Sequence, residues 1–105
     1  MKVVILESAE ADLHGLRRYI VKNFSLGTWQ TTFGKIKESI RDLAAFPYQG
    51  AIPPELEALH LTQYRQLLSG MNRIIYEVRE DTVYIHIVVD SRRDMKAFLM
   101  QRLVR

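Results

Sequence analysis

Cationic and aromatic side chains that could act on an anion gather in the second half of the chain. Guanidinium groups hold phosphates and carboxylates through paired hydrogen bonds, and histidine and tyrosine can accept or donate protons. A shared polar patch on neighbouring strands would combine the two chemistries. The residues that could form it are Tyr64, Arg65, Arg73, Tyr84, His86, Arg92 and Arg93.

Four of these side chains also have an ordinary structural explanation. Arg73 could be a solvated arginine at a strand end, and His86 could be a hydrogen-bonded strand histidine. Tyr64 and Tyr84 suit packing between neighbouring strands. Because side chains alternate along a strand, Tyr64 and Arg65 point to opposite faces, so only one of them can face a shared site.

A helix start is indicated at Ser91-Arg92-Arg93-Asp94. Ser91 and Asp94 fit a capping box, in which each side chain binds the backbone of the other residue. The two arginines would then oppose the helix dipole, which costs free energy unless an anion offsets it. We expect Arg93 to face an external anion, with pairing to Asp90 or Asp94 within the chain as the alternative.

Metal and nucleophile motifs are absent from the sequence. His14, His60 and His86 have no ligand-like spacing, and there is no phosphate-binding glycine loop or serine elbow. Without cysteine, neither a disulfide nor a thiolate metal site can form. We therefore expect no metal and no cofactor, and the reducing cytoplasm is the simplest location.

The length and charge of the chain limit the classes of protein to which it can belong. A chain of 105 residues suffices for one domain, residues 1–105, with one core. The amino-terminal apolar run is too short for a signal peptide, and no stretch approaches a membrane span. The net charge of +3 favours an acidic partner, either nucleic acid or protein.

Hydrophobic periodicity predicts a short strand followed by two helices. The strand covers Val3 to Leu6, and Ser8 then opens a helix with acidic residues in its first turn. Apolar residues recur every three or four positions as far as Phe24, and again from Trp29 to Leu43. The second helix ends before Pro47, so the two helices form an antiparallel hairpin joined by a short loop.

Three strands are predicted in the second half of the chain, after a loop rich in proline and glycine. There the spacing of apolar residues changes to two, which is typical of strands with one buried face. On the last strand the residues predicted to share a face are Val83, Ile85, Ile87 and Val89. The predicted strands cover residues 61–68, 73–78 and 82–89.

The predicted order of elements is β-α-α-β-β-β-α, with one helical turn at residues 55–58 and a last helix opened by residues 91–94. This order indicates an α+β fold in which the helical hairpin packs against one face of an antiparallel sheet. We expect the other face to be wetter and to carry the function.

The chain resembles the RelE/ParE superfamily of type II toxins over nearly its whole length. The resemblance implies a compact toxin whose antitoxin wraps its surface with an acidic or amphipathic segment. The last two of the matching segments are the most specific. These segments are the opening strand, the helix from Ala9 to Ile20, Leu43-Ala44-Ala45-Phe46-Pro47, Tyr64-Arg65-Gln66-Leu67, Gly70-Met71-Asn72-Arg73-Ile74-Ile75-Tyr76 and Val88-Val89-Asp90-Ser91-Arg92-Arg93-Asp94.

RelE-like members of the superfamily cut mRNA on the ribosome, and the resemblance implies this activity as one possibility for this chain. Two cations of such members correspond to Arg73 and Arg93. Their strand lysines and C-terminal tyrosine are replaced by Tyr64, Gln66 and Leu99, which removes most of the proton-transfer groups. For mRNA cleavage the candidate catalytic residues are therefore Arg73, Tyr84, His86 and Arg93.

ParE-like members inhibit DNA gyrase through a protein contact and lack the nuclease residues. The replacements and the Arg92-Arg93-Asp94 segment favour this branch, so we expect gyrase inhibition that a cognate antitoxin neutralises. Cleavage of mRNA on the ribosome and a non-toxic antitoxin-binding module are the alternatives, because one fold can host several functions. The expected partner surface, which includes the C-terminal helix, comprises Tyr64, Arg65, Arg73, Arg92, Arg93, Lys96, Arg102 and Arg105.

Overall fold

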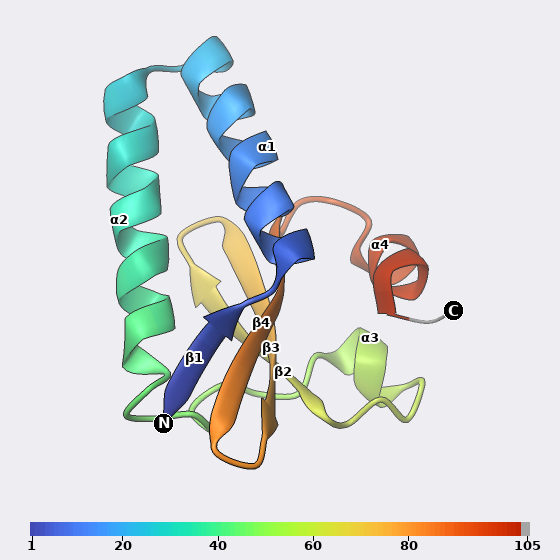
Figure 1. Ribbon diagram of the computed structural model, residues 1–105. Coiled ribbons are helices and arrows are strands. Elements are labelled where there is room, and N and C mark those ends of the chain that lie inside the picture. Colours follow the sequence, from blue (N-terminus) through green and yellow to red (C-terminus); the bar gives the residue numbers. More distant parts are fainter. Residues whose placement is uncertain (104–105) are drawn as a thin grey trace.

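The order of elements in the structure confirms the predicted order. The computed structural model describes residues 1–103, so the predicted partner residue Arg105 lies outside the described residues. Figure 1 shows the sheet between a long helical hairpin and two shorter helices. The elements are β1 (Lys2–Ile5), α1 (Glu7–Asn23), α2 (Leu26–Asp42), α3 (Pro54–Glu57), β2 (Tyr64–Ser69), β3 (Asn72–Arg79), β4 (Thr82–Asp90) and α4 (Met95–Leu103).

The four strands form one sheet in the order β1-β4-β3-β2. Strands β2, β3 and β4 form the predicted antiparallel meander. Strand β1 pairs with β4 in parallel, with Val3 opposite Val83 and Ile5 opposite Ile85. The prediction of an antiparallel sheet is therefore wrong for β1. The long helical connection after β1 allows this strand to join the free edge of β4 in the same direction.

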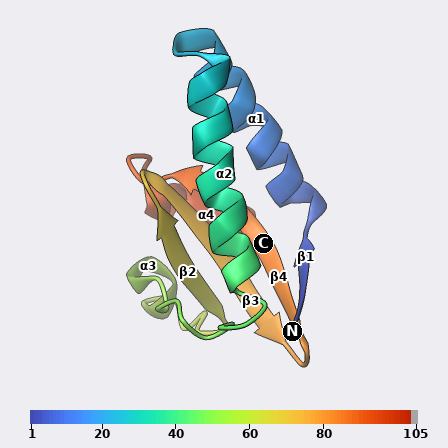
Figure 2. The same cartoon turned by 90° about the vertical axis from the view of Figure 1, so that its left-hand side faces the viewer.

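The helical hairpin covers one face of the sheet, as predicted. Ser25 caps α2, since its Oγ accepts a hydrogen bond from the Thr28 backbone at 3.0 Å. Helix α1 begins at Glu7, one residue before the predicted Ser8. The hairpin extends well beyond the end of the sheet (Figure 2), and every residue from 21 to 28 is exposed. The buried core between the hairpin and the sheet comprises Ala9, Ile36, Ile40, Leu43, Ile74, Tyr76, Val83, Ile85 and Val88.

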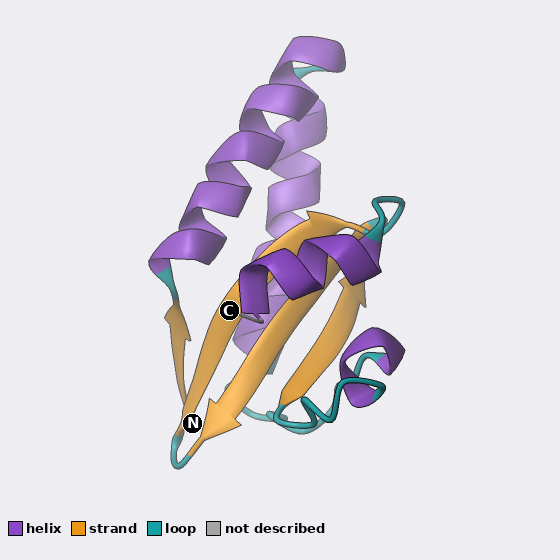
Figure 3. Ribbon diagram, turned by 90° about the vertical axis from the view of Figure 1, so that its right-hand side faces the viewer, coloured by secondary structure: helices purple, strands orange, loops and turns teal. Residues whose placement is uncertain are grey.

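A second core lies on the opposite face of the sheet, beneath α3 and α4. Figure 3 shows α4 lying across the strands on this side. The prediction of an open, wetter face is therefore wrong over much of this surface, because Met95 and Leu99 of α4 are buried against the strands. The buried residues of this core are Leu56, Tyr64, Ile75, Ile87, Val89, Met95 and Leu99.

Strand β4 contains a bulge at His86. The register between β3 and β4 shifts between Ile75 and Tyr76, which leaves His86 as an extra residue on β4. The alternation of side chains along β4 therefore changes sides at this point, and the predicted single face does not exist. Instead the four residues divide into two pairs, Val83 with Ile85 beneath the hairpin and Ile87 with Val89 beneath α3 and α4.

Side chains from two helices bind the backbone of β4 at the bulge, where β1 has already ended. The His86 carbonyl accepts hydrogen bonds from Ser8 Oγ at 3.3 Å and from Arg102 Nη2 at 3.0 Å. The Val88 amide donates to Asp12 Oδ2 at 3.1 Å. Since a buried backbone group without a partner costs free energy, these contacts stabilise the bulge.

Helix α4 begins at Met95 rather than at the predicted capping box. Asp94 caps it, since Asp94 Oδ1 accepts a hydrogen bond from the Ala97 amide at 3.3 Å. Ser91, Arg92 and Arg93 lie in the turn before the helix, where the Ser91 amide donates to the Met71 carbonyl at 2.7 Å. The predicted capping box is therefore wrong, and the two arginines do not occupy the first helical turn.

Candidate functional site

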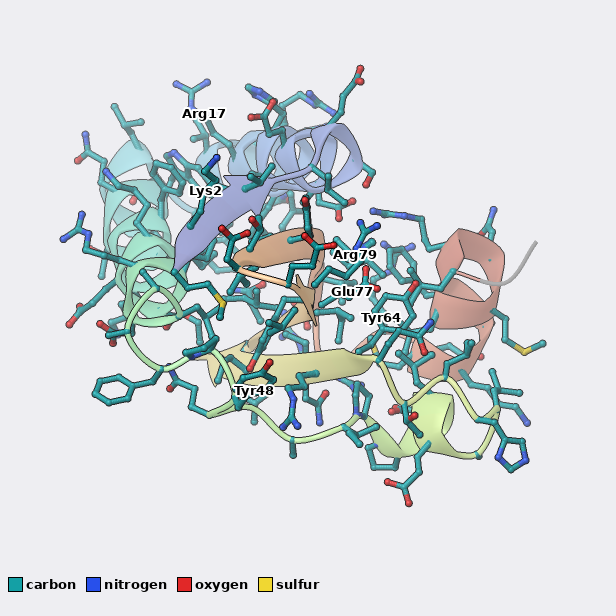
Figure 4. All side chains as sticks on the ribbon, turned by 60° about the horizontal axis from the view of Figure 1, so that its bottom comes forward. Lys2, Arg17, Tyr48, Tyr64, Glu77 and Arg79 are labelled. Atoms are coloured by element: carbon teal, nitrogen blue, oxygen red, sulfur yellow. The ribbon has the colours of Figure 1, made fainter. Side chains whose placement is uncertain are left out.

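A polar cluster lies on the α4 side of the sheet, beside the part that α4 covers. Register places Tyr64 of β2, Glu77 of β3 and Tyr84 of β4 in one row across three strands. His86 joins this row, because its Nε2 lies 3.0 Å from Glu77 Oε1 and its ring meets the Tyr64 ring edge-on at 5.2 Å. Figure 4 shows Tyr64, Glu77 and Arg79 side by side.

Glu77 is the centre of this cluster. Its Oε1 also forms an ion pair with Arg79 Nε at 3.3 Å, and the Arg79 guanidinium lies over the Tyr84 ring at 4.4 Å from the centroid. Burial, followed by the negative charge of Glu77, raises the pKa of Tyr64, so this phenol keeps its proton. A histidine oriented by a carboxylate is an arrangement suited to proton transfer.

The sequence prediction placed three of these residues in one patch and missed two. Tyr64, Tyr84 and His86 do lie together, whereas Glu77 and Arg79 were not predicted. Alternation along β3 would put Glu77 and Arg79 on one face, but their neighbours depend on the register and on the bulge, which the sequence pattern does not reveal.

Arg73 does not belong to this cluster. Its Nη1 and Nη2 donate to the two carboxylate oxygens of Glu55 in α3 at 3.0 and 3.1 Å, and its Nε donates to Gln66 Oε1 at 2.7 Å. The Arg73 side chain is 9% exposed. The hydrogen bonds from Arg73 are the main reason that the pKa of Glu55 is lowered. Arg73 therefore fastens α3 to the sheet.

Arg65 and Arg92 also bind within the chain. Arg65 Nη1 donates to the Gly50 carbonyl at 2.7 Å and its guanidinium lies over the Tyr48 ring, on the opposite face from Tyr64 as predicted. Arg92 forms two hydrogen bonds with the Asp90 carboxylate, at 3.0 and 2.6 Å, which lower the pKa of Asp90. The pairing with Asp90 that was the alternative for Arg93 is therefore made by Arg92.

Arg102 joins the C-terminal helix to the first helix. Its Nη1 lies 2.8 Å from Asp12 Oδ1 and its Nη2 3.2 Å from Asp12 Oδ2, with both side chains largely buried. The same guanidinium binds the His86 carbonyl at the bulge. One ion pair between residues 90 positions apart thus holds α4, α1 and β4 together.

Replacing Arg102 with alanine is expected to loosen α4. The change leaves Asp12 partly buried without its cation and the His86 carbonyl without one donor, so we expect a loss of about 2 kcal/mol in the free energy of unfolding. Chemical denaturation would measure it. Arg92→Ala is the matched control, because Arg92 is exposed and should leave the midpoint nearly unchanged. Equal midpoints for the two variants would contradict the anchoring role.

Arg93 and Lys96 remain as exposed cations of the predicted partner surface. Within residues 1–103 neither has an acidic side chain in ion-pair contact, and Arg93 lies over the Phe98 ring at 4.8 Å. Arg93 lines a groove of about 570 Å³ that also contains Tyr19, Asp12 and Asp90. Of the predicted partner residues with described positions, Arg93 is thus well placed to bind an external anion.

A second groove lies between α1 and α2, on the side that reaches β1. Its volume is about 590 Å³, and Trp29 and Phe33 stack in it at a centroid distance of 5.0 Å. Arg17, Lys37 and Arg41 stand around this apolar lining together with one acidic residue, Glu10. The surplus of cations suits an apolar segment that also carries acidic residues. In Figure 4 Arg17 projects from α1, well away from the Glu77 cluster.

The structure also bears on metals and membranes. Within residues 1–103, no three His, Asp or Glu side chains are arranged to hold a metal ion. No helix in the described part of the chain is long and apolar enough to cross a membrane.

Comparisons with known proteins give one family and one fold. Residues 3–95 match the family described as ParE toxin of type II toxin-antitoxin system, parDE. A solved structure described as the chromosomal ParDE TA system from P. aeruginosa is similar, with a TM-score of 0.71 and 18% sequence identity. The similarity covers 86% of this chain and 95% of that chain. No curated protein gives a match. At this identity the structural likeness shows the fold alone.

Proposed function

Because the chain belongs to the ParE toxin family of type II toxin-antitoxin systems, we propose that it inhibits DNA gyrase in the cytoplasm and that a cognate antitoxin neutralises it. One observation carries the choice of gyrase over RNA. Of the two arginines that a nuclease of this fold would turn toward a phosphate, Arg73 is engaged inside the molecule with Glu55. Arg73 uses its charge and one donor of each guanidinium nitrogen within the chain, so it is not turned toward a scissile phosphate.

A supercoiling and cleavage assay with purified gyrase tests this proposal. The purified chain is expected to block supercoiling, to trap cleaved DNA, or to do both, and its expression is expected to arrest growth. Untouched gyrase together with cleavage of mRNA on translating ribosomes would refute gyrase inhibition. Absence of growth arrest, with antitoxin binding retained, would favour a non-toxic binding module.

Cleavage of mRNA is the second candidate, and the Glu77–His86 contact favours it. The His86 imidazole is held by the Glu77 carboxylate beside Tyr64 and could transfer a proton. Arg79 supplies an exposed cation next to Glu77. If this candidate is right, His86→Ala should abolish ribosome-dependent cleavage in a variant that thermal unfolding shows to be folded. Cleavage that survives this change would remove His86 from the mechanism.

We propose that the antitoxin covers the groove between α1 and α2. The similar structure from P. aeruginosa is described as a ParDE TA system, which supports an antitoxin partner here. The apolar lining and the three surrounding cations would bind an amphipathic, acidic segment. Co-purification with a small acidic protein encoded beside this chain would support the assignment, and Phe33→Ala should weaken that complex in a chain that still folds.

Arg93→Ala is expected to reduce inhibition of gyrase several-fold without a matching loss of stability. The side chain is exposed, has no acidic partner among residues 1–103, and stands beside a groove. Inhibition curves and thermal unfolding of the same preparation would show both effects. Unchanged inhibition by a normally folded variant would count against an anion-binding role for Arg93.

A further inference from the structure

The positive charge of the protein is concentrated in the part of the helical hairpin that lies between the acidic residues near its two ends. Residues 13–37 contain no aspartate or glutamate and five basic residues. The remaining residues, with ten basic and twelve acidic side chains, carry a net charge of −2. The surplus positive charge therefore resides in this segment. Its basic residues are Arg17, Arg18, Lys22, Lys35 and Lys37.

These five cations differ from the arginines of the sheet, because none of them is in an ion pair within residues 1–103. Every salt bridge of the described chain involves residues of the sheet, α3, α4 or the start of α1. The field of residues 13–37 is therefore not cancelled by ion pairs, and it extends into solvent over about 8 to 10 Å at physiological salt.

Apolar side chains are exposed in the same place. Phe24 is 66% exposed and Tyr19 52%, and their rings meet edge-on at 6.3 Å. Val21 and Leu26 beside them are also exposed. We call residues 18–28 the hairpin tip. The tip lies beyond the end of the sheet in Figure 2, and these side chains are exposed within the described residues.

A shallow hollow continues this surface onto the sheet. It runs from Tyr19 and Phe24 past Lys35 to the turn between β2 and β3, where Met71 is exposed. It opens on a different face of α1 from the groove that contains Trp29 and Phe33. The two surfaces could thus be occupied by different partners.

We propose that the hairpin tip docks on an acidic protein surface of gyrase, with Phe24 and Tyr19 at the centre of the contact and Arg18, Lys22 and Lys35 around them. The inference rests on the proposed inhibition of gyrase and names the surface responsible for it. An aromatic centre surrounded by cations matches the anatomy of a protein interface. Binding to duplex DNA alone would use the cations and leave this apolar centre without a function.

The test compares the two halves of the contact with matched controls. Phe24→Ala removes the apolar centre, and the control Phe46→Ala removes an equally exposed phenylalanine from the loop after α2. Arg18→Glu combined with Lys22→Glu reverses the charge of the tip, and Lys2→Glu reverses an exposed cation on β1. All four changes are at exposed positions, so thermal unfolding should stay close to that of the unmodified chain.

Inhibition of supercoiling is the main measurement, supported by binding of the chain to gyrase without DNA at increasing salt. Both tip variants should need about tenfold more protein, or more, for half-inhibition, whereas the controls should stay within about twofold. Binding to DNA-free gyrase should weaken as salt is raised.

Three results would overturn the proposal. If the unmodified chain inhibits gyrase and the tip variants inhibit it equally, the tip is not the contact, although inhibition of gyrase stands. If the unmodified chain leaves gyrase untouched, the proposed function fails and this inference fails with it. If the tip instead binds bare duplex DNA more tightly than DNA-free gyrase, its partner is nucleic acid rather than protein.

Discussion

Replacing Gly50 with alanine should lower the free energy of unfolding by about 3 kcal/mol or more. A Cβ at this position would lie 2.4 Å from the Gln66 carbonyl oxygen and 2.7 Å from Tyr76 Oη. Relieving that overlap moves the loop away from the sheet. It then breaks the hydrogen bond from the Gly50 amide to Tyr76 Oη at 3.0 Å and the bond from Arg65 to the Gly50 carbonyl. Tyr76 is fully buried, so its hydroxyl would be left without a partner.

Gly34→Ala is the control for this experiment. Gly34 lies within α2, and a Cβ there meets no atom within 4 Å, so alanine should leave the fold intact and stabilise the helix by up to about 1 kcal/mol. Denaturant midpoints of the two variants should therefore move in opposite directions. A Gly50→Ala variant as stable as the unmodified chain would contradict the close approach of the loop to β2.

The helices and strands could be predicted from the sequence because their signals are local. The stripes of α1 and α2, the turns of the meander and the helical turn at α3 all depend on spacing over a few residues. The need for glycine at position 50 is not local. It arises from contacts with Gln66 and Tyr76, which are distant from Gly50 in the sequence. Gly50 could therefore be predicted only as a loop residue.

The bulge at His86 shows the same limit within a strand. Alternation along β4 favours one face for Val83 to Val89, and only the contacts from Ser8, Asp12 and Arg102 explain why the strand changes sides. A bulge depends on these distant partners, while periodicity reports only the average fit of a segment to a regular strand.

The candidate site was predicted less well than the fold, because the sequence shows which residues are charged but not which charges cancel. Arg92 next to Asp90 was a foreseeable pair. The partners of Arg73 and Arg102 lie 18 and 90 positions away, so both arginines seemed available to a partner. The run of residues without acids in the hairpin was visible in the sequence, and its significance came from the exposure of the tip.

Arg73→Met is expected to lower the free energy of unfolding by about 3 kcal/mol, because it removes one partner of a pair that is largely withdrawn from water. The change leaves the Glu55 carboxylate against the sheet without its cation and takes a hydrogen bond from Gln66. Chemical denaturation at neutral pH would measure the loss. An unchanged midpoint would show that the pair contributes little to holding α3.

The same pair predicts how stability depends on pH. In the folded chain the pKa of Glu55 is lowered, so its contribution is fully present above the ordinary value of 4.5 and is lost as the pH falls through the folded value. The difference in stability between the unmodified chain and Glu55→Gln should therefore be largest near neutral pH and shrink below about pH 4.5. A difference that grows on acidification would have the wrong sign for this pair.

The double variant Arg73→Met with Glu55→Leu separates the structural role of Arg73 from any role in toxicity. Removing both charges together leaves no uncompensated ion, so much of the stability lost in Arg73→Met should return. If gyrase inhibition returns with stability, then Arg73 acts by fastening α3 to the sheet. If the double variant folds as firmly as the unmodified chain and still fails to inhibit, then Arg73 has a direct part in the contact with the target.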